Sequence, residues 1–348
     1  MIETQDDLTG LGAVLSSADL TQDGHADLVV GCPWSSFKVN GSISDADSIN
    51  MGSLLAFHSS SERKANATLD ARRDASLSID GAGYEWLGQS SLLISSNATG
   101  MSQLLAVGAP GHRNSSGGTV GAVHFYSGDV EGADAKGKTC RCTIEGGAPL
   151  GEFGASLAVT AHAAPGSAVL AIGSPGEGEG TADLRAGAVR LLTLSSAFVQ
   201  QVCTGGRVVT LSELRSHGDL TATITGPKLS RLGRVVEFFS TGGEAVDHLL
   251  VAAPLANAGP DSPIVPSAER EVGAIFGWQR GLPRGHPTKA ASSATWHSVG
   301  VTPHGRLGSS LVSSGQWVLA GAPLASTNVE MGGQIAVVNL TPPDGDKQ

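Results

Sequence analysis

One phrase returns five times along this chain, and such a repeat constrains the fold more than any other feature. Each copy opens with Leu or Phe, then Gly, then a short apolar run. The five openings are LGAVL from Leu11, LGQSSLL from Leu87, FGASLAV from Phe153, LGRVVEF from Leu232 and LGSSLV from Leu307.

Three further runs follow each opening. The second closes on a small residue and proline about twenty residues later, at Pro33, Pro110, Pro175, Pro254 and Pro323. The third alternates apolar with other residues, as a half-buried strand does, and begins at Gly52, Gly121, Gly187, Gly273 and Gly333. A fourth, less regular run ends near Ile79, Ile144, Ile224 and Val299. Four strands per unit of about 65 to 80 residues predict an all-β fold of four-stranded β-propeller blades.

We therefore interpret residues 1–348 as a single β-propeller region. The repeats span about 9–81, 82–147, 148–226, 227–301 and 302–341, and 342–348 is a tail. The last repeat stops after its third strand, and Ile2 aligns with the ends of the other fourth strands. We expect upstream blades, or at least an upstream strand, that this sequence does not contain.

Composition and charge narrow the class of protein. The 48 glycines and the low aromatic content of 4% favour short strands and tight turns. A net charge of -10 without a Lys/Arg run argues against nucleic acid as a partner. No apolar stretch approaches the roughly 20 residues of a transmembrane helix.

Five glycosylation sequons point to a secreted protein, because this composition should give only about one or two by chance. They lie at Asn40, Asn66, Asn97, Asn114 and Asn339. The acidic start MIETQDDLTG is no signal peptide, so we expect the leader to be missing from this chain. The cysteines, Cys32, Cys140, Cys142 and Cys203, allow one or two disulfides whose pairing the sequence does not rank.

The first repeat carries a candidate metal site in the loop between its first two strands. The loop reads Asp19-x-Thr21-x-Asp23-Gly24-His25-x-Asp27, the spacing of a calcium loop. Oxygen ligands at alternate positions suit Ca²⁺, with the His25 carbonyl among them and Gly24 allowing the sharp turn. The equivalent loops of the other repeats lack the acids, so we predict one structural calcium site.

The motifs of catalysis are absent from the sequence. Its ten histidines form no HExxH, HxH or His-Cys pattern, and we expect each to be a surface or hydrogen-bonded residue. There is no G-x-S-x-G elbow and no phosphate-binding GxxxxGK[ST] loop. Catalysis by this chain alone is not expected.

The Leu/Phe-Gly openings, the GAP-like endings and the acidic loop together resemble the FG-GAP repeats of integrin α-chain propellers. A narrower resemblance is to the C-terminal propeller of the glycosylphosphatidylinositol (GPI)-specific phospholipase D family. It rests on the run DLTQDGHADLVVGCP, on GYEWLGQSSLL with LLAVGAP, and on ITGPKLSRLGRVV with LLVAAPLA.

That resemblance implies a secreted hydrolase that cleaves the inositol phosphate linkage of GPI anchors. Its catalytic zinc would sit in an upstream domain, followed by a propeller of about seven FG-GAP repeats. The partners would be that domain of the same polypeptide, with GPI-anchored proteins or glycans as further candidates. Only the calcium ligands transfer to this chain, at Asp19, Thr21, Asp23, His25 and Asp27, and Thr21 is the departure from the family pattern.

Two other functions remain open from the sequence. One is an integrin-α-like adhesion or ligand-binding propeller without enzymatic activity, which should continue into further domains and a membrane span. The other is a free-standing lectin-like or scaffold propeller, which would need a completed blade closure.

Overall fold

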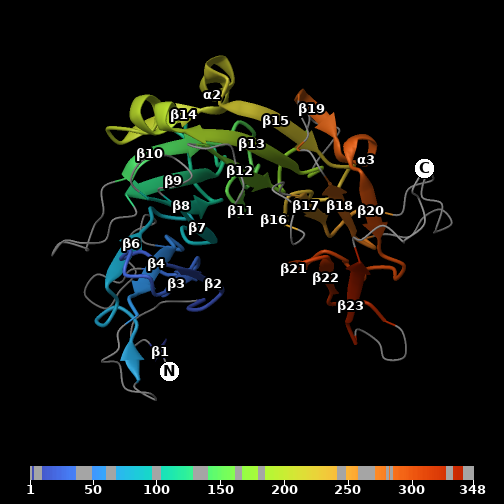
Figure 1. The fold of residues 1–348 in the computed structure, drawn as a ribbon, viewed down its shortest axis with the longest axis horizontal. Coiled ribbons are helices and arrows are strands. Elements are labelled where there is room, and N and C mark those ends of the chain that lie inside the picture. The colour runs from blue at the N-terminus through green and yellow to red at the C-terminus, as the bar shows by residue number, and fades with distance from the viewer. Residues whose placement is uncertain are drawn as a thin grey trace. The chain divides into compact units, whose positions relative to one another are not determined.

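The computed structural model describes residues 2–3, 10–36, 49–59, 68–95, 103–127, 140–160, 167–178, 185–240, 248–257, 271–279, 282, 285–326 and 332–339 (Figure 1). The fold is all-β, as predicted, and its sheets are propeller blades. The chain divides into two compact units. The first comprises Met1–Leu157, Ala164–Ala168 and Thr193–Leu220, and the second Ala158–Ala163, Val169–Leu192 and Thr221–Gln348.

The first unit holds the blades of repeats one and two. The first blade has the strand order β2 (Val14–Ala18), β3 (Asp27–Cys32), β4 (Ser53–Phe57), β6 (Leu77–Asp80). The second blade has the order β7 (Ser90–Ile94), β8 (Leu104–Ala109), β9 (Ala122–Ser127), β10 (Cys140–Glu145). Neighbouring strands within both meanders are antiparallel.

Most residues of the other blades belong to the second unit. The third has the order β11 (Ser156–Val159), β12 (Ser167–Ser174), β13 (Ala188–Ser195), β15 (Leu220–Thr225). The fourth has β16 (Val235–Phe239), β17 (His248–Ala253), β18 (Ala274–Trp278), β20 (Trp296–Val299). The described residues of the fifth form β21 (Ser310–Ser314), β22 (Trp317–Ala322) and β23 (Gln334–Asn339). The short helix α3 (Ala290–Ser293) precedes β20.

Three parallel strand pairs extend this plan in a way that the sequence did not predict. In each, one strand comes from a segment that precedes the fourth strand of its repeat, and in two of the three its partner is the outer-edge strand of the blade before it. β14 (Arg207–Thr210) pairs with β10, and β19 (Gly285–Lys289) pairs with β15. β5 (Leu69–Asp70) also pairs in parallel with β1 (Ile2–Glu3), and these two short strands form a sheet of their own. β1 therefore pairs with β5 as the fourth strands β10 and β15 pair with β14 and β19.

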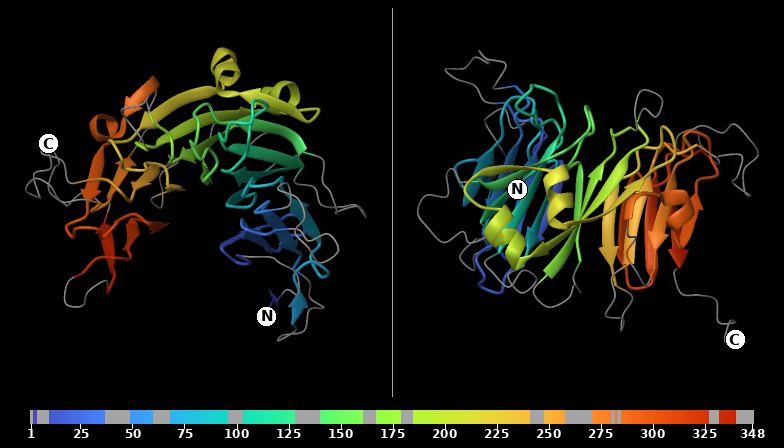
Figure 2. Two further views of the ribbon diagram at one scale, coloured as in Figure 1. Left: turned by 180° about the vertical axis from the view of Figure 1, so that it is seen from behind. Right: turned by 90° about the horizontal axis from the view of Figure 1, so that it is seen from above.

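The segment that carries β14 is tied to the second blade by a disulfide. It contains the short helices η2 (Phe198–Val202) and α2 (Leu211–His217), which lie beyond the outer edge of the sheet (Figure 2, yellow). Cys142 on β10 is bonded to Cys203, and the rings of Phe125 and Phe198 meet at 6.2 Å between centroids. The structure thus selects one pairing among those left open, and Cys32 is buried without a disulfide.

The inner strands are buried on both faces because sheets pack against one another. Every residue of β4, β8, β17 and β18 is buried. Such strands need small residues where backbones approach. A Cβ added to Gly31 would lie 2.1 Å from the Gly88 carbonyl oxygen, and one added to Gly108 would lie 2.0 Å from that of Gly154.

These contacts give the repeat motifs a structural meaning. At three junctions a glycine near the end of the second strand lies against the Gly of the next Leu/Phe-Gly, and at the fourth Ala252 takes its place. The glycine that opens the third strand forms a parallel bridge to the same Leu or Phe, in the pairs Gly52–Leu87, Gly121–Phe153, Gly187–Leu232 and Gly273–Leu307. The residue before that Leu or Phe is left-handed in each case, at Trp86, Glu152, Arg231 and Arg306. One local structure therefore recurs at four junctions.

None of the helices in the described part of the chain has the length and apolar character needed to span a bilayer.

Candidate functional site

The acidic loop of the first blade connects β2 to β3 and is shaped by its own carboxylates. Asp19 accepts the N–H of Asp23 at 3.2 Å and that of Gly24 at 3.0 Å. Asp23 accepts the N–H of His25 at 2.8 Å. These exposed contacts are typical of turns in which Asp side chains bind nearby backbone. The loop geometry is therefore set by local hydrogen bonds.

Asp27, at the first position of β3, has a different environment. It is 1% exposed, and its two oxygens accept the N–H groups of Leu20 at 2.8 Å and of Ser59 at 2.7 Å. Asp27 thus links the loop to the strand end of β4. Its burial distinguishes it from Asp23, which lies in solvent.

Calcium binding by this loop remains a prediction. The Thr21 hydroxyl oxygen is buried and has no hydrogen-bond partner, so this oxygen suits a cation ligand. The carboxylate oxygens of Asp19, Asp23 and Asp27, however, do not gather within 4.8 Å of one another. The five candidate ligands share one loop, and coordination would require Asp19 and Asp23 to turn toward a common point.

The glycosylation candidates fall partly within the described residues. Asn114 is half-buried in a turn, where its Oδ1 accepts the N–H groups of Ser116 and Gly118. Asn339 is exposed at the end of β23. Asn40, Asn66 and Asn97 lie outside the described residues.

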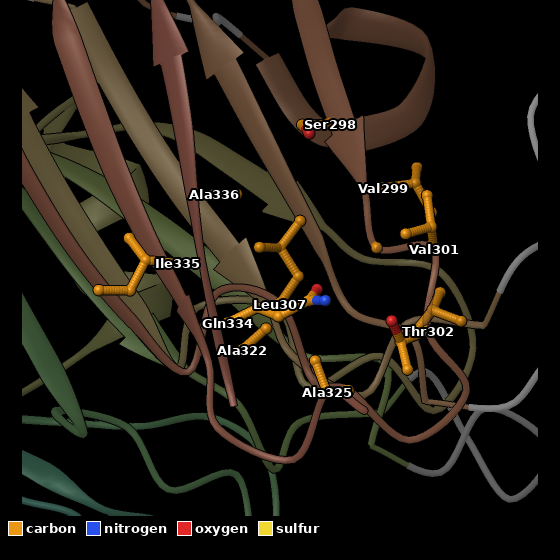
Figure 3. Close-up of a pocket in the computed structure, with 13 residues that line it drawn as sticks. Ser298, Val299, Val301, Thr302, Leu307, Ala322, Ala325, Gln334, Ile335 and Ala336 are labelled. Carbon is orange, nitrogen blue, oxygen red and sulfur yellow. The ribbon is translucent and has the colours of Figure 1, made fainter. Parts of the chain in front are cut away.

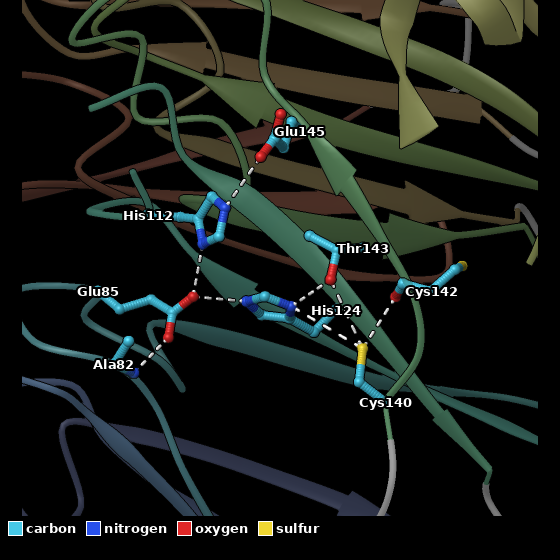
Figure 4. Close-up of polar contacts among 8 residues, drawn as sticks. All are labelled: Ala82, Glu85, His112, His124, Cys140, Cys142, Thr143 and Glu145. Atoms are coloured by element: carbon cyan, nitrogen blue, oxygen red, sulfur yellow. Dashed lines mark hydrogen bonds and ion pairs between the residues drawn. The ribbon is translucent and has the colours of Figure 1, made fainter. Parts of the chain in front are cut away.

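A second group of side chains, on the second blade, was missed by the sequence analysis (Figure 4). Glu85 lies in the turn before β7, His112 in the turn after β8, and His124 on β9. Among the described residues, these are the only three His, Cys, Asp or Glu side chains whose ligand atoms all lie within 4.8 Å.

One carboxylate oxygen joins the two imidazoles. Glu85 Oε1 lies 2.7 Å from His112 Nδ1 and 2.8 Å from His124 Nε2. Its other oxygen accepts the N–H of Ala82 at 2.5 Å. Glu85 is 6% and His124 8% exposed, whereas the His112 side chain is 19% exposed. The group is thus buried on one side and reachable from solvent on the other.

The remaining imidazole nitrogens contact β10. His112 Nε2 lies 3.3 Å from Glu145 Oε1, and His124 Nδ1 lies 2.8 Å from Thr143 Oγ1. Thr143 is the direct cross-strand partner of His124 in the β9–β10 register, which places these side chains on the same face. Both rings are therefore held at both nitrogens.

Cys140 lies beside this group without joining its centre. Its thiol donates to the Cys142 carbonyl oxygen at 3.1 Å, and Sγ lies 4.0 Å from His124 Nδ1. A Cys–His–Glu sequence of contacts resembles nucleophilic triads, but this thiol is directed at its own strand.

The charges of the group reinforce one another. Burial would raise the pKa of Glu85, but the hydrogen bonds with His112 and His124 hold that pKa well below its usual range. Burial would lower the pKa of His124, but its contacts with Cys140 and Glu85 raise the pKa to about 9. Burial would likewise raise the pKa of Cys140, yet His124 and Thr143 lower it.

The repeat register was the signal that could have found this group. His112 follows the repeat's proline, Pro110, by two residues, and His124 follows the glycine of the third strand, Gly121, by three. In the third repeat the same two positions hold Glu177 and Arg190, which form an ion pair. In both repeats, side chains at these two positions lie close together. Neither histidine belongs to a contiguous sequence motif.

A pocket of about 440 Å³ lies in the second unit between β20 and β23 (Figure 3). Its lining is mostly apolar, with Ser298, Thr302 and Gln334 as polar members, and includes no ionisable side chain. The pocket therefore offers shape and apolar surface but no acid–base group.

The comparisons with known proteins do not assign a family. No family model matches the chain, and no curated protein matches it significantly.

Proposed function

We propose that this chain is the non-catalytic FG-GAP propeller region of a secreted protein resembling GPI-specific phospholipase D. The single observation that carries the proposal is the recurring junction between repeats. In it, the opening Leu/Phe-Gly of one repeat meets the glycines of the repeat before it. The FG and GAP motifs of the sequence are the two sides of this contact, which supports reading them as one signature.

The parallel edge pairs support a longer propeller. β1 pairs with β5 as the fourth strands β10 and β15 pair with β14 and β19. A fourth-strand position for β1 is compatible with an upstream blade, as a propeller of about seven repeats requires. Hydrolysis of the inositol phosphate linkage would belong to an upstream zinc domain. The propeller would pack on that domain or present the anchored substrate.

The proposal includes Ca²⁺ at the acidic loop and a glycosylated, secreted protein. Calcium would bring Asp19 and Asp23 together and pin the β2–β3 hairpin. Asn114 and Asn339, at least partly exposed, are compatible with sugar attachment.

The test compares this chain with the native polypeptide isolated from cells that secrete it. We expect the native, deglycosylated polypeptide to exceed 35.1 kDa and to release a GPI-anchored protein from membranes when zinc is present. The chain of 348 residues alone should leave the anchored protein attached. Release by this chain alone, or a native mass near 35.1 kDa, would contradict the proposal.

A further inference from the structure

We propose that Glu85, His112 and His124 form a binding site for a divalent transition-metal ion of the zinc type. The proposal concerns this chain's own second blade. It goes beyond the proposed function and does not depend on it.

The three ligand atoms already converge. Glu85 Oε1 lies 2.7 Å from His112 Nδ1 and 2.8 Å from His124 Nε2. Zinc binds histidine nitrogen and carboxylate oxygen at about 2.0 to 2.2 Å, which in a tetrahedral site separates two ligand atoms by about 3.3 Å. Each nitrogen therefore needs to move about half an ångström away from the carboxylate oxygen, and the two nitrogens must also come to about 3.3 Å from each other within a group whose ligand atoms now lie within 4.8 Å of one another. The two imidazole planes are inclined to each other by 76°.

The outer contacts are those that hold metal-binding histidines. Such a histidine commonly donates its second N–H to a carboxylate, carbonyl or hydroxyl, which fixes the ring and its tautomer. His112 offers Nε2 to Glu145 at 3.3 Å, and His124 offers Nδ1 to Thr143 at 2.8 Å. Figure 4 shows each ring placed between Glu85 and its outer partner. Each imidazole is thus oriented before an ion arrives.

The donor set selects the class of ion. Two imidazoles and one carboxylate suit zinc and related transition metals, whereas Ca²⁺ and Mg²⁺ prefer oxygen ligands alone. A three-residue set leaves a coordination position for water. The partial exposure of His112 gives an ion access from solvent.

The position of Cys140 excludes it from the ligand set. Its Sγ approaches His124 at Nδ1, the nitrogen opposite to the one that faces Glu85. Cys140 therefore neighbours an outer contact, and its thiol should not bind the ion.

The first experiment titrates metal-stripped protein with Zn²⁺ against a competing chromogenic chelator. We expect one tightly bound equivalent in wild type. His112→Gln should lower the affinity by roughly 100-fold or more, and Glu145→Gln by roughly 10- to 100-fold as a positioning residue. His217→Gln, at an exposed histidine on α2, is the matched control and should bind as wild type does. Cys140→Ser should also retain wild-type affinity.

A second measurement reads the ligands from the spectrum of a metal ion bound to wild type. Co²⁺ bound to wild type should give visible absorption bands of a four-coordinate site without a thiolate charge-transfer band. Less than one equivalent of Zn²⁺, or unchanged affinity in a folded His112→Gln, overturns the proposal. A thiolate band that disappears in Cys140→Ser overturns the ligand set.

Discussion

The second and third blades place different chemistry at the same two repeat positions. In the second blade His112 and His124 meet Glu85, and in the third Glu177 and Arg190 meet each other. The third-blade pair is satisfied by its own two charges, since both carboxylate oxygens bind the guanidinium. The second-blade group has two nitrogens directed at one oxygen and can exchange protons for a metal ion. The scaffold therefore fixes where side chains meet, and their identity decides whether they close on each other or accept a ligand.

The largest loss of stability is expected when the ion pair of the third blade is broken. Glu177→Ala should leave the buried Arg190 without a carboxylate and lower the free energy of unfolding by about 3 to 5 kcal/mol. Urea unfolding measures the loss. The double variant Glu177→Ala/Arg190→Met should recover most of it, because the equivalent positions of the fourth blade are buried and apolar, at Ala256 and Phe276. A double variant as unstable as the single one would show that the cost is not the uncompensated charge.

The acidic loop of the first blade is a contrasting candidate metal site, because its ligands all come from one short stretch of sequence. If calcium binds only the folded protein, Ca²⁺ at ten times its Kd should stabilise wild type by about 1.4 kcal/mol. Differential scanning fluorimetry with and without chelator measures this as a rise in Tm. Asp23→Ala should abolish the rise with little effect in chelator, because Asp23 is exposed. A wild-type Tm that is unchanged by calcium would contradict the prediction of a calcium site.

The smallest effect concerns an exposed counterpart of the third-blade ion pair. Arg306, at the start of the fifth repeat, binds Glu271 of the fourth repeat at 2.7 Å and holds the pKa of this carboxyl below its ordinary value of 4.5. A depressed pKa stabilises the folded state above the ordinary value, and this stabilisation is lost as the pH falls through the folded pKa. Both side chains are about a third exposed or more, so the contribution should be below about 1 kcal/mol.

Urea unfolding at neutral and at acidic pH measures that contribution. Wild type should lose slightly more stability on acidification than Arg306→Gln, in which Glu271 has no guanidinium partner. An equal loss in both proteins would place the origin of the acid sensitivity elsewhere.

The blades were predictable because their signals are local. Period-two apolar runs, strand-ending prolines and glycines at close approaches lie within a few residues of the strands that they define. The edge strand β14 could not be predicted in this way, because the short run Arg207–Thr210 belongs to the third repeat yet pairs with the second blade. Such a pairing depends on the path of the long connection between β13 and β15, which local sequence does not specify.

The two candidate metal sites differ in the same respect. The acidic loop was visible because its five candidate ligands lie within nine consecutive positions, from Asp19 to Asp27. Glu85, His112 and His124 are far apart in the chain, and only the blade register joins them. The expectation that each histidine is hydrogen-bonded holds for His112 and His124, but it did not reveal that they share one carboxylate.

The Cys142–Cys203 bond also changes what a protease can do to this molecule. The two cysteines are 61 positions apart, so any peptide bond cut between them leaves both fragments covalently joined. A nick after Cys142 at the very end of the second repeat, or before Cys203 in the third, would be invisible by mass on a non-reducing gel and would appear only after reduction. The disulfide thus makes a broken chain remain one molecule.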